Sequence, residues 1–241
     1  MGRVLIEQVS KPIQMGGLSD SVGLSIGAFM LTRGALSVGD MLHRADLAMY
    51  EAKRTGRSRL VFFEESMETA SRSRAQIQVD MKTAISERQF FMVYQPQVDR
   101  HDSIRGVESL VRWRHPQRGM ISPAEFIPVA EEPGLIIPLG HWVLLTACRQ
   151  ARAWMDAGIE MGEMAVNISA VQFRQPDFVQ SVRRVLADTG LPADRLELEI
   201  TETAVMHSAD SSVTTLSELK AMGVKLAIDD FGTGYSSLAY L

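Results

Sequence analysis

In the second half of the chain, apolar residues follow two alternating periods, which predicts strands and helices in turn. Short runs with the two-residue period of a strand lie at residues 91–94, 104–113, 164–168, 196–201 and 224–229. Segments with the helical period separate most of them, one beginning at Ser122 and the others at residues 141–157, 176–189 and 211–222. Regular alternation of this kind predicts an α/β fold with a parallel sheet, either open or closed into a barrel.

The first 62 residues carry fewer elements, and they predict a small α+β segment. A strand is expected at residues 22–29, a helix from Asp40 to about residue 54, and a second strand at residues 58–63. Asp40 is a candidate N-cap and Gly56 follows the helix end. Two strands and one helix bury too little apolar surface for a comfortable domain. The polar stretch from residue 64 to 89 has a narrow apolar face, so we place a linker helix at 63–80 and a second domain at 81–241.

The composition of the chain excludes some classes of function but does not identify a single one. The chain has 241 residues, 46% of them hydrophobic, and a net charge of -4. This balance predicts no nucleic-acid polymer as partner, although a small anionic ligand remains possible. No apolar run approaches the roughly 18 residues of a membrane span, so no membrane segment is expected. The single cysteine, Cys148, excludes an internal disulfide framework, reads as a buried small hydrophobe, and favours a reducing, cytoplasmic location.

Candidate oxygen ligands for a metal lie on, or at the ends of, successive predicted strands. Glu108 is on the second strand, Asn167 ends the third, Glu199 is on the fourth, and Asp229 and Asp230 end the fifth. Each residue alone could be a rim ion pair, a turn former or a solvated acid. Together they suit Mg²⁺ or Mn²⁺ better than zinc, because no cysteine or histidine cluster accompanies them. Four carboxylates in one site predict two metal ions that share a bridging water, an arrangement that cleaves phosphodiesters.

Motifs in the first 62 residues carry a resemblance to a known family. They are Ser25-Ile-Gly27, Ala45-Asp-Leu-Ala-Met-Tyr-Glu-Ala-Lys53 and Gly56-Arg-Ser-Arg59. This stretch resembles the C-terminal end of a GGDEF (diguanylate cyclase) domain. The family's signature loop and its nucleotide- and metal-binding residues do not occur in the stretch. The resemblance therefore implies no cyclase activity for these residues.

Further motifs follow in the order of a second family across residues 81–241. They are Tyr94-Gln-Pro96, Glu108-Ser-Leu-Val-Arg-Trp113, Pro123-Ala-Glu-Phe-Ile-Pro128, Val166-Asn-Ile-Ser169, Glu197-Leu-Glu-Ile-Thr-Glu202 and Asp229-Asp-Phe-Gly-Thr-Gly234. Together they resemble the EAL-type cyclic di-GMP phosphodiesterases. The resemblance implies a modified TIM (β/α) barrel, incomplete here, that hydrolyses cyclic di-GMP to the linear dinucleotide with Mg²⁺ or Mn²⁺.

The resemblance also implies a role for each matching residue. The metal ligands would be Glu108, Asn167, Glu199 and Asp229, with Asp230 at the second metal. Arg112 would meet a substrate phosphate, whereas Gln95 and Leu110 would line the substrate pocket. Glu202 would hold the loop at residues 231–237. The catalytic set implied is Glu108, Asp229, Asp230 and Glu202.

Two departures from the family pattern affect what is expected of the chain. Ser109 replaces the alanine of the family's naming triplet, which is a mild change because serine is also small. The sequence stops at Leu241, about 160 residues into a barrel that takes ~250, so the family's later lysine, glutamate and glutamine are absent from it. We therefore expect weak or no turnover from residues 1–241. The alternatives are a non-catalytic module that binds cyclic di-GMP or a partner, or a fragment of a GGDEF–EAL signalling protein. A homodimer through the barrel is also possible.

Overall fold

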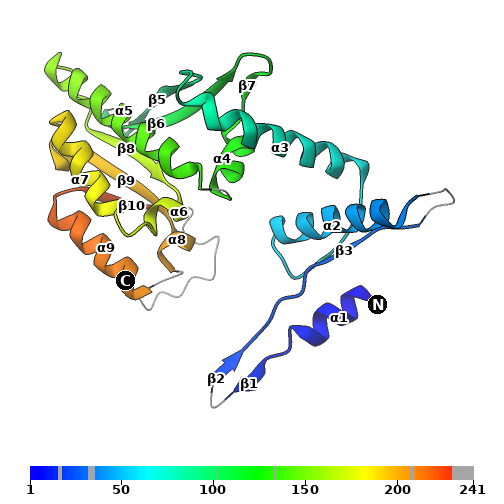
Figure 1. Cartoon of the computed structure of the whole chain (residues 1–241). Helices are drawn as coiled ribbons and strands as arrows, with labels where there is room; N and C mark the ends of the chain where they lie inside the picture. Colours follow the sequence, from blue (N-terminus) through cyan, green and yellow to red (C-terminus); the bar gives the residue numbers. More distant parts are fainter. Residues whose placement is uncertain (16–17, 32–35, 102, 133, 207–208, 230–241) are drawn as a thin grey trace. The chain divides into compact units, whose positions relative to one another are not determined.

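The computed structural model of the chain describes residues 1–15, 18–31, 36–101, 103–132, 134–206 and 209–229. Its contacts divide the chain into two compact units, and the division falls between Gln76 and Ile77. This point lies inside helix α3 (Glu65–Ala84), in the region predicted as a linker helix (Figure 1). Each unit is described by itself below.

The first unit contains two small pairs of strands and two helices of its own within the described residues. Strands β3 (Ile26–Ala28) and β4 (Leu60–Phe62) are parallel, and helix α2 (Val38–Arg54) connects them. These elements confirm the predicted strand–helix–strand order, with shorter strands than expected. Helix α1 (Gly2–Val9) and the antiparallel pair β1 (Ile13–Met15) and β2 (Leu18–Asp20) were not predicted.

The N-terminus of α2 corrects the predicted cap. Ser37, not Asp40, is the N-cap residue. The backbone N–H of Asp40 donates to Ser37 Oγ at 3.1 Å, and the Asp40 carboxylate accepts from the Ser37 hydroxyl at 2.7 Å. The pKa of the Asp40 carboxyl is lowered by the hydrogen bonds that it accepts from the Ser37 hydroxyl and from the Ser37 backbone N–H. Serine and aspartate are both good N-cap residues, so sequence alone did not show that Asp40 closes a capping box begun three residues earlier.

Replacing Gly27 with alanine should destabilise the first unit. A Cβ at Gly27 would lie 2.1 Å from both the backbone O of Ala45 and the backbone N of Met49, so α2 would have to move away from β3. We expect a loss of about 2–3 kcal/mol. Gly39→Ala is the control, because its Cβ would meet nothing closer than Ser37 Oγ at 3.6 Å. Hydrogen exchange of the β3 and α2 amides should accelerate only in Gly27→Ala; equal protection in both variants would contradict this.

The second unit is a sheet with helices that follow its strands. Its elements after α3 are β5 (Phe90–Val98), β6 (Ile104–His115), β7 (Gly119–Ile121), α4 (Pro123–Glu131), α5 (Ile136–Asp156), β8 (Glu163–Ile168), α6 (Ala170–Phe173), α7 (Phe178–Thr189), the 3₁₀ turn η1 (Ala193–Arg195), β9 (Leu196–Thr201), α8 (Glu202–Met206), α9 (Ala209–Ala221) and β10 (Lys225–Asp229). The strand order is β10-β9-β8-β6-β5, and β7 also pairs with β6. The predicted α/β alternation is thus confirmed.

The direction of β5 departs from the expected parallel sheet. Strands β6, β8, β9 and β10 are mutually parallel, but β5 runs antiparallel to β6. Only residues 99–103 connect β5 to β6. A parallel pair needs a crossover of a dozen residues or more, whereas a short connection makes a hairpin. The length of this connection therefore reverses β5.

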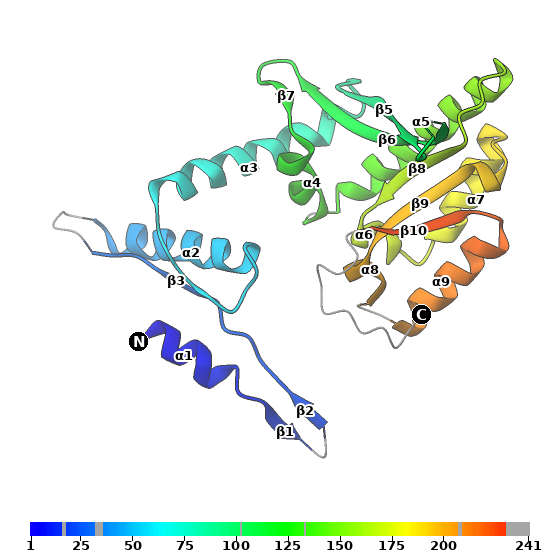
Figure 2. The ribbon, with the colours of Figure 1, turned by 180° about the vertical axis from the view of Figure 1, so that it is seen from behind.

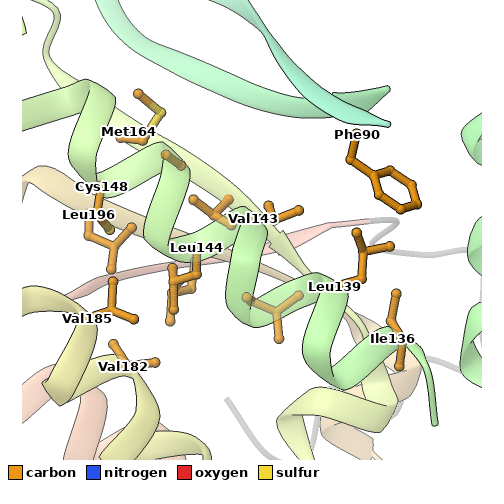
Figure 3. Close-up of a cluster of buried hydrophobic side chains, with 14 of the residues drawn as sticks. Phe90, Ile136, Leu139, Val143, Leu144, Cys148, Met164, Val182, Val185 and Leu196 are labelled. Carbon is orange, nitrogen blue, oxygen red and sulfur yellow. The ribbon is translucent and has the colours of Figure 1, made fainter. Parts of the chain in front are cut away.

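Helices α5, α7 and α9 lie on one side of the sheet (Figures 1 and 2), and the apolar core lies between them and the strands. The side chains labelled in Figure 3 come from α5 (Ile136, Leu139, Val143, Leu144, Cys148), α7 (Val182, Val185) and the strands (Phe90, Met164, Leu196). Cys148 is fully buried, as predicted. Burial raises the pKa of its thiol to about 12, so it behaves as a small apolar group.

Two helix starts differ in detail from their predictions. Helix α4 begins after Ser122 with Pro123 in its first turn, as expected, but no capping hydrogen bond forms from the Ser122 side chain. Glu125, in the first turn of α4, accepts from Arg118 Nη2 at 3.0 Å. Helix α5 begins at Ile136 rather than at residue 141. Pro138 is tolerated there because the first turn of a helix does not use its N–H groups.

Candidate metal and substrate site

The strand registers place four predicted ligands on the face of the sheet opposite the buried core. Glu199 of β9 pairs with Asn167 of β8 and with Ala227 of β10, and Asp229 lies two residues beyond Ala227. Glu108 of β6 pairs with Ala165, which precedes Asn167 by two residues. Residues paired across a sheet, and residues two apart on one strand, share a face. Glu108, Asn167, Glu199 and Asp229 therefore lie on one face, although a shared face does not by itself make them ligands.

Side-chain hydrogen bonds connect these strands within the site. Asn167 Nδ2 donates to Glu108 Oε1 at 2.8 Å, which joins β8 to β6. Gln97 Nε2 donates to Glu199 Oε1 at 3.4 Å, which joins β5 to β9. Sequence reasoning missed Gln97. The available signal was its position two residues after Gln95, which places both side chains on the same face of β5.

The electrostatics of Glu199 show that the acids lie close enough to repel one another. Its pKa is raised first by burial and then by the negative charges of Glu108, Glu197 and Asp229, whereas the hydrogen bond from Gln97 lowers it. These acids come from β6, β9 and β10, so three strands contribute to one negative region. A divalent cation would relieve this repulsion, and carboxylate and amide oxygens are the ligands that Mg²⁺ and Mn²⁺ take. The residues present therefore fit such an ion.

A cavity of about 270 Å³ lies beside the candidate ligands. Leu110, Arg112, Asn167 and Glu199, all predicted site residues, line part of it. Apolar residues of α4 and α5 form much of the remaining wall, among them Pro123, Ile127, Ile136, Leu139 and Val143. A mostly apolar cavity that also carries some polar groups is typical of small-molecule sites. The Arg112 guanidinium donates from Nη1 to the carbonyl of Val111 at 2.9 Å.

The other predicted residues stand apart from this cavity or outside the described residues. Gln95 is exposed and pairs with Glu108 across β5 and β6, but it does not line the cavity. Glu202 is buried at the start of α8. Asp230 and the loop at 231–237 lie outside the described residues. Within the described ranges, three or more His, Cys, Asp or Glu side chains do not gather closely enough to hold a metal. The ligand roles therefore stay a prediction.

Comparison with protein-family models identifies the class to which the chain belongs. A model described as "EAL domain" matches residues 78–241, and one described as "Diguanylate cyclase, GGDEF domain" matches residues 1–59. The first match covers most of the chain. The chain therefore belongs to the EAL domain family and carries a GGDEF segment ahead of its EAL domain. Phosphodiesterases of the EAL type generally depend on divalent metals.

Curated relatives share this arrangement over nearly the whole chain. The bifunctional diguanylate cyclase/cyclic di-GMP phosphodiesterase MucR of Pseudomonas aeruginosa is 43% identical over 98% of this chain and 35% of its own length. The cyclic di-GMP phosphodiesterase NbdA of the same organism is 37% identical over 98% of this chain and 30% of its own length. The chain thus spans about a third of the length of these relatives.

Solved structures confirm the expected fold class. The phosphodiesterase PaMucR in complex with c-di-GMP is 48% identical and has a TM-score of 0.66, covering 68% of this chain and 67% of its own. The EAL enzyme Bd1971 in a cGMP-bound form is 28% identical with a TM-score of 0.65, covering 86% of this chain and 54% of its own. These neighbours are TIM-barrel-like, which confirms the predicted barrel-type EAL fold preceded by a GGDEF remnant. No helix in the described ranges is long and apolar enough to cross a bilayer.

Replacing Glu199 with glutamine should stabilise the metal-free chain at neutral pH while weakening metal binding. Folding raises the pKa of Glu199 above its ordinary value of 4.5. The protonated carboxyl therefore contributes to the stability of the fold, fully so below pH 4.5. This contribution is lost as the pH rises through the raised pKa. At neutral pH the ionised Glu199 therefore opposes folding, and a neutral amide does not. Thermal unfolding in a chelator should show a higher midpoint for the variant at neutral pH and a smaller difference in acid.

The same Glu199→Gln variant should bind Mn²⁺ about tenfold more weakly or worse, because even partners outside the ligand set change affinity by that factor. Glu160→Gln is the control, since Glu160 is exposed in the segment between α5 and β8. A destabilised Glu199→Gln chain with unchanged Mn²⁺ affinity would contradict the expected role of Glu199.

Proposed function

We propose that the chain carries the metal- and phosphate-binding part of a phosphodiesterase that hydrolyses cyclic di-GMP to the linear dinucleotide. The observation that carries the proposal is the single polar face on which Glu108, Asn167 and Glu199 lie, beside a cavity that Arg112 also lines. The relatives MucR and NbdA, both named as cyclic di-GMP phosphodiesterases, support the same activity. The complex of PaMucR with c-di-GMP supports cyclic di-GMP as the ligand.

Each side chain has a distinct role in this proposal. Glu108, Asn167, Glu199 and Asp229 would hold Mg²⁺ or Mn²⁺, with Asp230 at a second ion. A divalent pair would supply an acidified water and neutralise charge on the phosphate. The Asn167–Glu108 hydrogen bond keeps the Glu108 carboxylate in one orientation before an ion binds.

The substrate would be held by groups on β5 and β6. Arg112 offers a planar fork of donors that suits a phosphodiester, once its guanidinium turns from the Val111 carbonyl. Leu110 and the apolar wall would receive a guanine ring, and Gln95 would contact the substrate from β5. Glu202, buried at the start of α8, would hold the loop at residues 231–237.

Hydrolysis and binding assays test the proposal together. The purified chain is incubated with cyclic di-GMP and either Mn²⁺ or a chelator, and the linear dinucleotide is quantified by chromatography. We expect slow formation of product at most, and only with the metal, together with binding of cyclic di-GMP by calorimetry. Binding without product would favour the alternative of a non-catalytic binding module. Absence of both would reject the proposal.

A homodimer and a cytoplasmic location are two further predictions for this protein. A homodimer through the EAL domain is tested by light scattering on the purified chain over a range of concentrations. A cytoplasmic location, suggested by the single buried Cys148, is tested by fractionation of cells that express the protein.

A further inference from the structure

His115, the last residue of β6, uses both of its ring nitrogens. Its Nδ1 accepts from the backbone N–H groups of Gln117 at 3.2 Å and Arg118 at 3.1 Å. A nitrogen that accepts two hydrogen bonds carries no proton, so the proton of the neutral ring is on Nε2. This Nε2 lies 3.2 Å from Asp80 Oδ2 on helix α3. The imidazole is only 7% exposed, so the contact is shielded from water.

Asp80 lies on the side of α3 that packs into the second unit. Ile77, Met81 and Ala84 of the same helix are buried in the core. A second attachment follows the helix: Trp113 Nε1 donates to Gln89 Oε1 at 2.9 Å. Two side chains near the C-terminal end of β6 therefore contact this region. His115 contacts Asp80 of α3, and Trp113 donates to Gln89, which follows α3.

The same strand end also borders the substrate cavity, which Ser109, Leu110, Val111 and Arg112 line. Arg112 immediately precedes Trp113 in the sequence, and its side chain lines the cavity. The turn that His115 holds is also joined to the cavity wall, because Arg118 Nη2 donates to Glu125 at the start of α4 at 3.0 Å. Two residues of α4, Pro123 and Ile127, line the cavity. His115 is thus linked to groups that would contact the substrate in two ways: along the backbone of β6 to Arg112, and through the Arg118–Glu125 hydrogen bond to α4.

We propose that Asp80 and His115 form a positioning pair, which fixes the end of β6 and the β6–β7 turn so that Arg112 and α4 keep the geometry that binds the dinucleotide. The pair acts through these groups and touches no reacting atom. The inference rests on the proposed function. The competing interpretation is a core histidine that only packs edge-on against Trp113, with the ring centroids 5.7 Å apart.

Paired substitutions in the full chain separate the two interpretations. His115→Phe keeps a ring beside Trp113 and removes both nitrogens, and Asp80→Leu removes the carboxylate at similar volume. Each should raise the KM for cyclic di-GMP about tenfold with a much smaller change in kcat, as expected of a partner outside the reacting groups. The Mn²⁺ affinity should stay unchanged, because Glu108, Asn167 and Glu199 are held by the pairing of β6, β8 and β9.

Conservative variants provide the matched controls. His115→Gln offers an acceptor to the turn and a donor to Asp80, and Asp80→Asn keeps an acceptor oxygen, so both should keep KM near that of the unmodified chain. The double variant Asp80→Leu/His115→Phe should be no worse than either single variant, because the two residues act as one unit. An unchanged KM in both non-conservative variants, whatever their unfolding midpoints, would overturn the proposal.

A second readout does not depend on turnover. Hydrogen exchange at the amides of residues 112–115, 117–118 and 124–127 should accelerate in Asp80→Leu and stay slow in Asp80→Asn. Unchanged exchange in Asp80→Leu would overturn the positioning pair even in an active protein. If the unmodified chain neither binds nor hydrolyses cyclic di-GMP, the proposed function fails. Accelerated exchange confined to Asp80→Leu would then still support the coupling of α3 to the cavity wall.

Discussion

Replacing Glu108 with glutamine should lower the rate of cyclic di-GMP hydrolysis by about 1000-fold, equivalent to about 4 kcal/mol of transition-state stabilisation. Glu108 accepts the hydrogen bond from Asn167, and its negative charge raises the pKa of Glu199. Glutamine preserves the shape of the side chain but removes the charge that a divalent cation needs. The loss should therefore appear mainly in kcat and in Mn²⁺ affinity, while the fold is retained.

Glu160→Gln is the matched control for Glu108→Gln, because it also exchanges one carboxylate for an amide but lies exposed and away from the site. Hydrolysis rates are measured over a series of Mn²⁺ concentrations for both variants and the unmodified chain. Glu160→Gln should match the unmodified chain. Turnover by Glu108→Gln within tenfold of the unmodified chain at saturating Mn²⁺ would contradict the assigned role of Glu108.

Replacing Trp113 with alanine should destabilise the second unit by about 3–5 kcal/mol. Trp113 is fully buried. Its ring packs against Phe90, with centroids 5.2 Å apart, and edge-on against Phe126 at 5.6 Å. Its Nε1 donates to Gln89 Oε1 at 2.9 Å, so truncation removes a large apolar contact and leaves that amide oxygen without its donor.

Trp113→Phe is the control for this substitution, because it retains an aromatic ring while losing the indole N–H. It should destabilise the unit by a smaller amount, of the order of 1–3 kcal/mol for an unmade hydrogen bond and a partial void. Urea unfolding followed by circular dichroism gives the midpoint and slope for each variant. Equal midpoints for Trp113→Ala and the unmodified chain would show that the ring cluster contributes little to the core.

Strand β9 shows most clearly which features the sequence alone could predict. Its residues alternate between the buried Leu196, Leu198 and Ile200 and the half-buried Glu197 and Glu199. This two-residue period was visible in the sequence, and it determined which side chains enter the core and which remain available to a site. The placement of Glu199 on the polar face could therefore be predicted.

The partners of these residues could not be predicted in the same way. The Gln97–Glu199 contact joins residues 102 positions apart, and it forms only because β5 reverses direction and pairs with β6. The Asp80–His115 contact likewise depends on how α3 packs on the strands. Alternation along one strand does not say which strand lies beside it or in which direction that neighbour runs.

The sequence by itself therefore predicted most of the strands and helices, the buried and polar faces of β9, and a set of candidate oxygen ligands suited to a divalent cation. Local periodicity and side-chain chemistry are sufficient for these features. The tertiary structure decided the hydrogen-bond partners of Glu108 and Glu199 and the attachment of β6 to α3. These depend on which segments meet in space, and that choice is made by the packing of the whole core.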